Sequence, residues 1–93
     1  MKSTERGHAL ANEIIALWKR FTNENPTSTG CVIVMSKVRI YDLIQLGEEY
    51  LDSESIAAIQ KGKFTAAKFM RAIPFAVSED CKDIEFRDAS EPK

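Results

Sequence analysis

The sequence has few of the residues from which small catalytic and metal sites are built. Its 93 residues include one histidine, two cysteines and four glycines. The glycines are isolated, so no glycine-rich phosphate loop is present. Cys31 and Cys81 lie too far apart for the paired ligands of a zinc site or for a disulfide framework, although a single bridge between them stays open. The sequence therefore predicts no metal, no cofactor and no enzyme activity.

The few reactive side chains also favour structural roles. His8 has no base, ligand or carboxylate at a recognisable spacing, so we expect a surface residue. Cys31 lies in an apolar run, which is typical of an inert core thiol. Cys81 lies among acidic residues, which would raise the pKa of its thiol rather than lower it. The carboxylate clusters match no calcium loop and are interpreted as solvated faces and caps.

Long hydrophobic runs are absent as well. No stretch approaches the roughly 18 apolar residues that a membrane span needs. No charged leader precedes an apolar run. The expectation is a soluble, cytoplasmic protein with reduced thiols and no membrane partner.

What the sequence does contain is an ordinary globular composition, with 44% apolar and 29% charged residues. That composition excludes a disordered chain. The length predicts one compact domain over residues 1–88 with a frayed tail at 89–93. The net charge of −1 argues against a non-specific polyanion binder. The predicted fold class is α+β and mainly helical, with four helices and a small antiparallel sheet.

The clearest predicted helix covers residues 4–23. Leu10, Ile14 and Leu17 recur at helical spacing, and Ser3 or Thr4 can cap the start. The apolar face of this helix is wider than one core contact needs. Plain core packing explains it, and so does a face for a partner, which leaves a homodimer open.

The middle of the chain predicts a strand followed by a helix. Residues 31–35 form a β-branched run after a glycine, which is typical of a buried strand. Ser36 can cap a helix over about 37–51 with an apolar stripe that includes Ile40, Leu43 and Ile44. Gly47 either permits close packing or ends that helix early. Continuation of the strand through residues 38–41 remains an alternative.

The last third of the chain predicts two short helices and two strands. Asp52 or Ser53 can cap a helix at about 54–61, and Gly62 is a natural helix stop. A further helix starts at Thr65 and ends before Pro74. Residues 75–77 and 84–87 are expected to pair as a terminal hairpin beside the strand at 31–35.

The segment 53–73 has the spacing of a helix-turn-helix motif. Ala58 supplies the small residue of the first helix, Gly62 the turn, Phe64 the apolar plug, Thr65 the cap and Phe69 the anchor of the second helix. On these positions the segment resembles the DNA-binding helix-turn-helix of small phage Cro and repressor domains. Such proteins usually bind DNA as dimers, so the resemblance implies transcription regulation by a dimer.

The same segment carries the densest basic run of the chain. Lys61, Lys63, Lys68 and Arg71 occur there without an intervening acidic residue. The resemblance implies that Lys68 and Arg71 contact guanine edges or phosphates, while Lys61 and Lys63 contact the DNA backbone. Lys63 lengthens the turn by one residue relative to the motif. The alternative is that all four side chains merely solvate two short core helices.

Two functions follow from these patterns. The first is a small non-enzymatic regulator that binds double-stranded DNA through residues 53–73. The second is a protein-binding module, such as a small inhibitor from a phage or another mobile element or an antitoxin-like partner. That module would act through acidic and apolar surfaces, because acidic segments such as residues 79–91 can cover a basic surface of a protein target.

Overall fold

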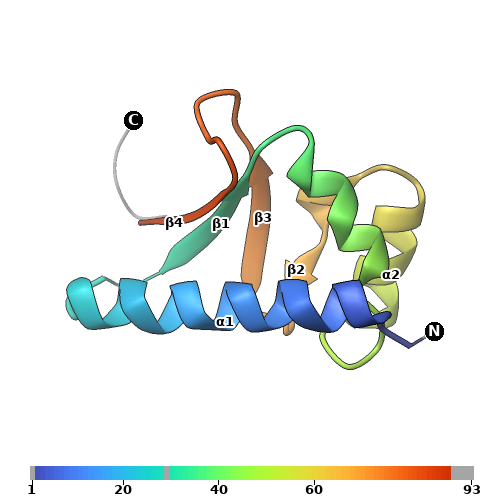
Figure 1. The fold of residues 1–93 in the computed structure, drawn as a ribbon, viewed down its shortest axis with the longest axis horizontal. Helices are drawn as coiled ribbons and strands as arrows, with labels where there is room; N and C mark the ends of the chain where they lie inside the picture. Colours follow the sequence, from blue (N-terminus) through green and yellow to red (C-terminus); the bar gives the residue numbers. More distant parts are fainter. Residues whose placement is uncertain (1, 29, 89–93) are drawn as a thin grey trace.

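The fold combines a long helix with a four-stranded mixed sheet (Figure 1). It is seen in a computed structural model that describes residues 2–28 and 30–88. The elements in chain order are α1 (Glu5–Glu24), β1 (Cys31–Met35), the 3-10 helix η1 (Arg39–Gln45), α2 (Ser53–Gln60), the 3-10 turn η2 (Phe64–Ala66), β2 (Lys68–Phe69), β3 (Ile73–Val77) and β4 (Ile84–Asp88).

The sheet is built around β1. Its strand order is β2-β3-β1-β4, with β1 parallel to β3 and antiparallel to β4. Ile33 lies opposite Phe75 on one side and Phe86 on the other. Because side chains alternate between the faces of a strand, these three share one face. All three belong to the core cluster or pack against it, so this is the buried face of the sheet.

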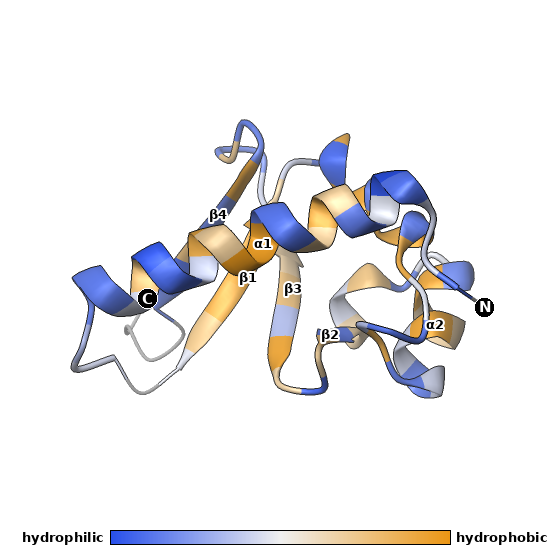
Figure 2. Ribbon diagram, turned by 60° about the horizontal axis from the view of Figure 1, so that its bottom comes forward, coloured by the Kyte–Doolittle hydropathy of each residue, from blue (hydrophilic) through white to orange (hydrophobic). Residues whose placement is uncertain are grey.

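Helix α1 covers that face. It runs across the strands, and Figure 2 shows that hydrophobic and hydrophilic residues alternate along it. Leu10, Ala11 and Ile14 are buried in the same cluster as the sheet residues. Thr4 caps the helix by accepting a hydrogen bond from the Gly7 amide. The helix predicted over residues 4–23 is confirmed. Within the described residues, no helix is long and apolar enough to cross a membrane.

The segment after β1 is a 3-10 helix instead of the predicted α-helix over 37–51. Ser36 does accept a hydrogen bond from the Arg39 amide, as its predicted capping role requires. A 3-10 helix has three residues per turn, so positions three apart lie along one edge. Ile40, Leu43 and Leu46 form the buried edge. The helix ends before Gly47, which agrees with the second of the two roles predicted for that glycine.

The predicted antiparallel sheet is wrong. Residues 75–77 and 84–87 do not pair as a hairpin, because β3 and β4 lie on opposite sides of β1. The chain returns from β1 to β3 through η1, α2 and η2, and such a crossover allows two strands to run parallel. The limits predicted for the strands at 31–35 and 84–87 agree closely with β1 and β4. Strand β2 was not predicted.

The predicted fourth helix, after Thr65, is also wrong. Only the short turn η2 forms there, and residues 68–69 belong to β2. Ser55 in α2 fixes this strand, because its hydroxyl accepts a bond from the Lys68 amide at 3.0 Å and donates to the Lys68 carbonyl at 3.5 Å. Phe69 is then buried, and Pro74 lies within β3 opposite Lys68. The burial of Phe69 outweighs the local helix signals.

The turn between β2 and β3 holds two residues in an unfavourable conformation. Met70 and Arg71 have φ values of 51° and 65°, and the Ala72 amide donates to the Phe69 carbonyl. Left-handed backbone costs an ordinary residue about 1–2 kcal/mol, and asparagine and glycine tolerate it best.

We therefore expect the double variant Met70→Asn, Arg71→Gly to raise the free energy of unfolding by about 1 kcal/mol. Urea denaturation followed by circular dichroism measures the change. The same substitutions in a helix would be destabilising, since glycine costs about 1 kcal/mol there. A loss of stability would therefore contradict this turn.

Candidate functional site

The four basic residues predicted to bind DNA are all exposed, but they lie on different elements. Lys61 caps the end of α2, and Lys63 lies between α2 and η2. Lys68 belongs to β2, and Arg71 lies in the turn that follows it. Because the helix that would carry Lys68 and Arg71 does not form, the predicted recognition helix is absent. DNA binding by these four side chains stays a prediction, and a recognition helix does not support it.

Contacts of α2 show how these basic residues are arranged around it. Lys68 hydrogen-bonds through its backbone to Ser55 in the first turn. The pKa of the Asp52 carboxyl is lowered, mainly by hydrogen bonds from Ser55 and to a smaller extent by the positive charge of Arg71. Lys68 and Arg71 therefore lie near the start of α2, whereas Lys61 is at its end. An eight-residue helix is about 12 Å long.

A polar cluster joins the start of α1 to the loop before α2. His8 Nδ1 lies 2.9 Å from the Tyr50 hydroxyl, and His8 Nε2 lies 3.5 Å from Glu49. The Ser3 amide and hydroxyl both donate to Glu49, at 2.9 and 3.0 Å, which lowers the pKa of this carboxyl. Sequence spacing had suggested that His8 lacks a carboxylate partner, and the fold supplies one.

The side chains of this cluster are not arranged as they are around a catalytic serine nucleophile. A nucleophilic serine needs its hydroxyl against the histidine that acts as base. Here the Ser3 hydroxyl donates to Glu49 and accepts a bond from the Gly47 amide at 2.8 Å. The arrangement therefore fastens the start of α1 to the 45–50 loop, and His8 is exposed as predicted.

The two thiols are free and poorly suited to attack. Burial raises the pKa of both Cys31 and Cys81, and the charge of Asp88 raises that of Cys31 further. Cys81 is buried, with its sulfur 3.4 Å from the Val34 carbonyl oxygen. Within residues 2–28 and 30–88, no group of three or more histidine, cysteine or acidic side chains is arranged to hold a metal ion.

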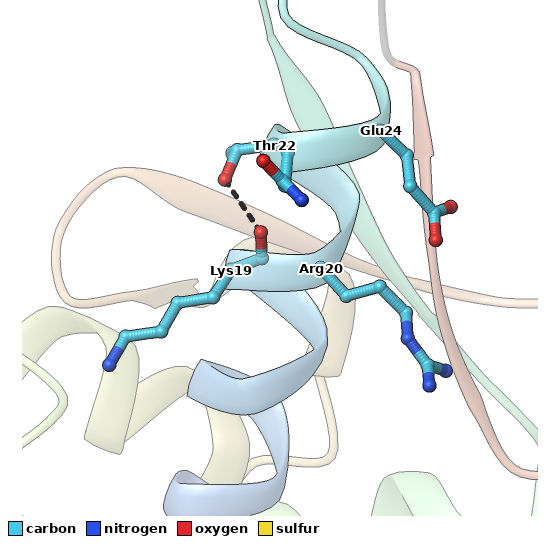
Figure 3. A pocket seen from close by; sticks show the side chains of 5 residues that line it. Lys19, Arg20, Thr22 and Glu24 are labelled. Atoms are coloured by element: carbon cyan, nitrogen blue, oxygen red, sulfur yellow. Dashed lines mark hydrogen bonds between the residues drawn. The ribbon is translucent and has the colours of Figure 1, made fainter.

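A hollow at the end of α1 brings no polar groups together. Figure 3 shows Lys19, Arg20 and Glu24 spreading apart along it. Its one hydrogen bond between the residues drawn runs from the Thr22 hydroxyl to the Lys19 carbonyl, inside the same helical turn. This hollow offers solvated charges and no reactive pair.

Much of the acidic surface near the end of the chain is neutralised by ion pairs. Glu79 pairs with Lys37 at 2.6 Å, and Asp83 lies 3.1 Å from the Nε atom of Arg39. Arg39 also contacts Glu13 and Asp42, so it connects α1, η1 and the loop before β4. Because of these ion pairs, the acidic residues between Glu79 and Asp88 create a weaker negative surface charge than a count of carboxylates indicates. Residues 89–93 lie outside the described part of the chain.

An apolar ridge on η1 is the most distinctive exposed feature. Val38, Tyr41 and Ile44 are 80%, 62% and 45% exposed. They are three residues apart, so they lie along one edge of the 3-10 helix, away from the buried edge. Phe64 extends the ridge, because its ring packs edge-on against Tyr41 with 5.4 Å between ring centroids. We call these four side chains the η1 ridge.

Sequence reasoning missed the η1 ridge because it assumed an α-helix. At 3.6 residues per turn, Ile40, Leu43 and Ile44 share one face, and Ile44 was therefore assigned to the core. The available signal was two interleaved apolar series, each with a spacing of three. Val38, Tyr41 and Ile44 form one series, and Ile40, Leu43 and Leu46 form the other.

Comparison with protein family models, with curated proteins and with solved structures found no significant match. The functional conclusion therefore rests on the geometry of this chain.

Proposed function

We propose that this protein is a non-enzymatic protein-binding module and that the η1 ridge binds its protein target. The observation that carries the proposal is the exposure of Val38, Tyr41 and Ile44 along one edge of η1. Isolated apolar residues on a surface are normal, but a contiguous row is typical of an interaction site.

The ridge has the properties of a preorganised interface. The opposite edge of η1, formed by Ile40, Leu43 and Leu46, is anchored in the core. The backbone under the ridge is therefore held before binding, which reduces the entropy that a partner must overcome. Tyr41 combines a large apolar ring with a hydroxyl, and tyrosine is enriched among residues that dominate binding energies.

The charges around η1 support the same reading. Arg39 and Asp42 occupy the third edge of the helix and pair with each other, and Arg39 also pairs with Glu13 and Asp83. These charged side chains form ion pairs with one another beside the ridge, so the exposed apolar edge is left for a partner. A polar rim around an apolar centre is the usual anatomy of a protein interface.

The test places a photo-crosslinking amino acid at Tyr41 and recovers crosslinked proteins from cells that naturally contain the chain. We expect one discrete partner to crosslink at this position. Its affinity, measured with the purified pair, should fall at least about tenfold in the variant Val38→Ser, Tyr41→Ser, Ile44→Ser. The variant should remain folded, because all three side chains project into solvent.

The matched control is Trp18→Ser, which removes another exposed apolar side chain. Trp18 is 40% exposed and lies near Pro26 and Cys31, away from η1. Equal losses in both variants would overturn the role of the ridge.

The DNA-binding hypothesis is tested on the same preparations. Association with DNA at about 50 mM salt that is lost in Lys68→Ala and Arg71→Ala would favour it over a protein target.

A further inference from the structure

Two lysines stand beside the η1 ridge without an acidic partner. Lys63 directly precedes Phe64, the residue that extends the ridge, and Lys61 lies two positions earlier at the end of α2. Both lysine side chains are exposed. In the part of the chain that the structure describes, neither ammonium group takes part in an ion pair. Their positive charge is therefore available to a partner.

The two lysines lie on one flank of the ridge, and paired charges lie on the other. A 3-10 helix has three edges, and in η1 they are the ridge, the edge buried in the core, and the edge of Arg39 and Asp42. Phe64 packs against the core cluster as well as against Tyr41, so it lies where the ridge meets the core. Its neighbouring lysines border that flank. The other flank is formed by Arg39 and Asp42, which pair with each other at 3.4 Å.

We infer that the η1 ridge binds an apolar segment of a partner protein that is bordered by acidic residues. This inference rests on the proposed function of the ridge and names the chemistry of its target. Apolar side chains of the segment would cover the ridge. Its carboxylates would face Lys61 and Lys63. Opposite charges around an interface accelerate association and exclude partners of the wrong charge.

A nucleic acid is also negatively charged, but the ridge is poorly suited to one. Unpaired bases bind proteins by stacking on the planar faces of aromatic side chains. Val38, the most exposed residue of the ridge at 80%, and Ile44 at the other end offer no planar face. The rings of Tyr41 and Phe64 meet edge-on at an interplanar angle of 84°, so part of their aromatic surface is already covered. Aliphatic side chains at both ends of the ridge therefore favour a protein segment.

A displayed library of random peptides of about 16 residues tests the inference without knowledge of the natural partner. The ridge is about 12 Å long, because a 3-10 helix rises about 2.0 Å per residue, and such a peptide covers it in helical or extended form. The library is selected on the wild type and, separately, on Lys61→Glu, Lys63→Glu. Peptides that also bind Val38→Ser, Tyr41→Ser, Ile44→Ser are removed. We expect the wild type to enrich acidic apolar peptides and the charge reversal to enrich basic apolar ones.

Fluorescence anisotropy with one enriched peptide measures the size of the effect. Lys61→Glu, Lys63→Glu should weaken binding about tenfold at about 50 mM salt and by less at about 500 mM, because salt screens exposed charges. The matched control is Lys19→Glu, Arg20→Glu, which changes the net charge equally at exposed positions toward the C-terminal end of α1. This control should keep the affinity within about twofold.

The outcomes separate this inference from the proposed function. Peptides that need the ridge but show no acidic excess on the wild type, or the same excess on the charge reversal, would overturn the inference and leave the ridge as a binding site. If no peptide preferred the wild type over the ridge variant, the proposed function would fail and this inference with it. Binding of labelled oligothymidylate that is lost in both the ridge variant and the charge reversal would overturn the inference in favour of a single-stranded nucleic acid.

Discussion

Replacing Gly7 with alanine is expected to lower the free energy of unfolding by about 2 kcal/mol or more. A Cβ atom at this position would lie 2.0 Å from the Gln45 carbonyl oxygen and 2.7 Å from its carbon. Both contacts are with backbone, so no side chain can move aside. The Thr4 amide also donates to this carbonyl at 3.1 Å, so a shift of Gln45 would disturb the start of α1.

The sign of this effect makes it diagnostic. Alanine is the better helix former by about 1 kcal/mol, so replacing an ordinary helical glycine with alanine stabilises the protein. The control is Ala9→Gly at an exposed position of the same helix, with an expected loss of about 1 kcal/mol. Urea denaturation compares the two variants. If Gly7→Ala were the more stable protein, the close approach of α1 to the 45–50 loop would be refuted.

Replacing Phe69 with alanine is expected to cost about 3–5 kcal/mol, as is typical of a buried aromatic ring. Phe69 is 2% exposed. Its ring stacks on Tyr50 with 6.0 Å between centroids and meets Phe75 edge-on at 6.3 Å. The same denaturation experiment measures the loss. Since small domains are stable by only about 5–15 kcal/mol, the variant should be partly unfolded at moderate temperature.

A comparison with Phe64 separates the observed strand from the predicted helix. In a helix that begins at Thr65, Phe64 and Phe69 would contact each other as a hydrophobic staple. In the structure the ring of Phe64 packs against Tyr41, whereas the ring of Phe69 packs against Tyr50 and Phe75. Phe64→Ala should therefore cost much less than Phe69→Ala, and a double-mutant cycle should give a coupling energy below about 0.5 kcal/mol. A larger coupling would support the helical arrangement.

Elements with complete local signals were predicted well. The stripe of Leu10 and Ile14 together with the Thr4 cap is sufficient for α1, because period and capping are properties of neighbouring residues. Asp52 and Gly62 mark the limits of α2 in the same way: Asp52 accepts a bond from the Ser55 amide, and Gly62 follows the helix with a φ of 79°.

The candidate site was predictable only in part. Exposure of Lys61, Lys63, Lys68 and Arg71 follows from their charge, but their placement on different elements depends on where the chain turns. The η1 ridge was not predicted, because an α-helix and a 3-10 helix formed by the same residues bury different faces. A spacing of three in two interleaved series indicates the tighter helix, yet only the contacts of Ile40 and Leu43 with the core decide which series is inside.

By itself the sequence determined the long helix, the central strand, the short α2 and the lack of a metal-ligand motif, since these depend on residues close together in the chain. Tertiary structure alone decided that β1 runs parallel to β3, that residues 68–69 form a strand and that Val38, Tyr41 and Ile44 face solvent. The physical reason is that burial of Phe69 and pairing around β1 join distant segments, and their free energy exceeds the few tenths to about 1 kcal/mol per residue of local preference.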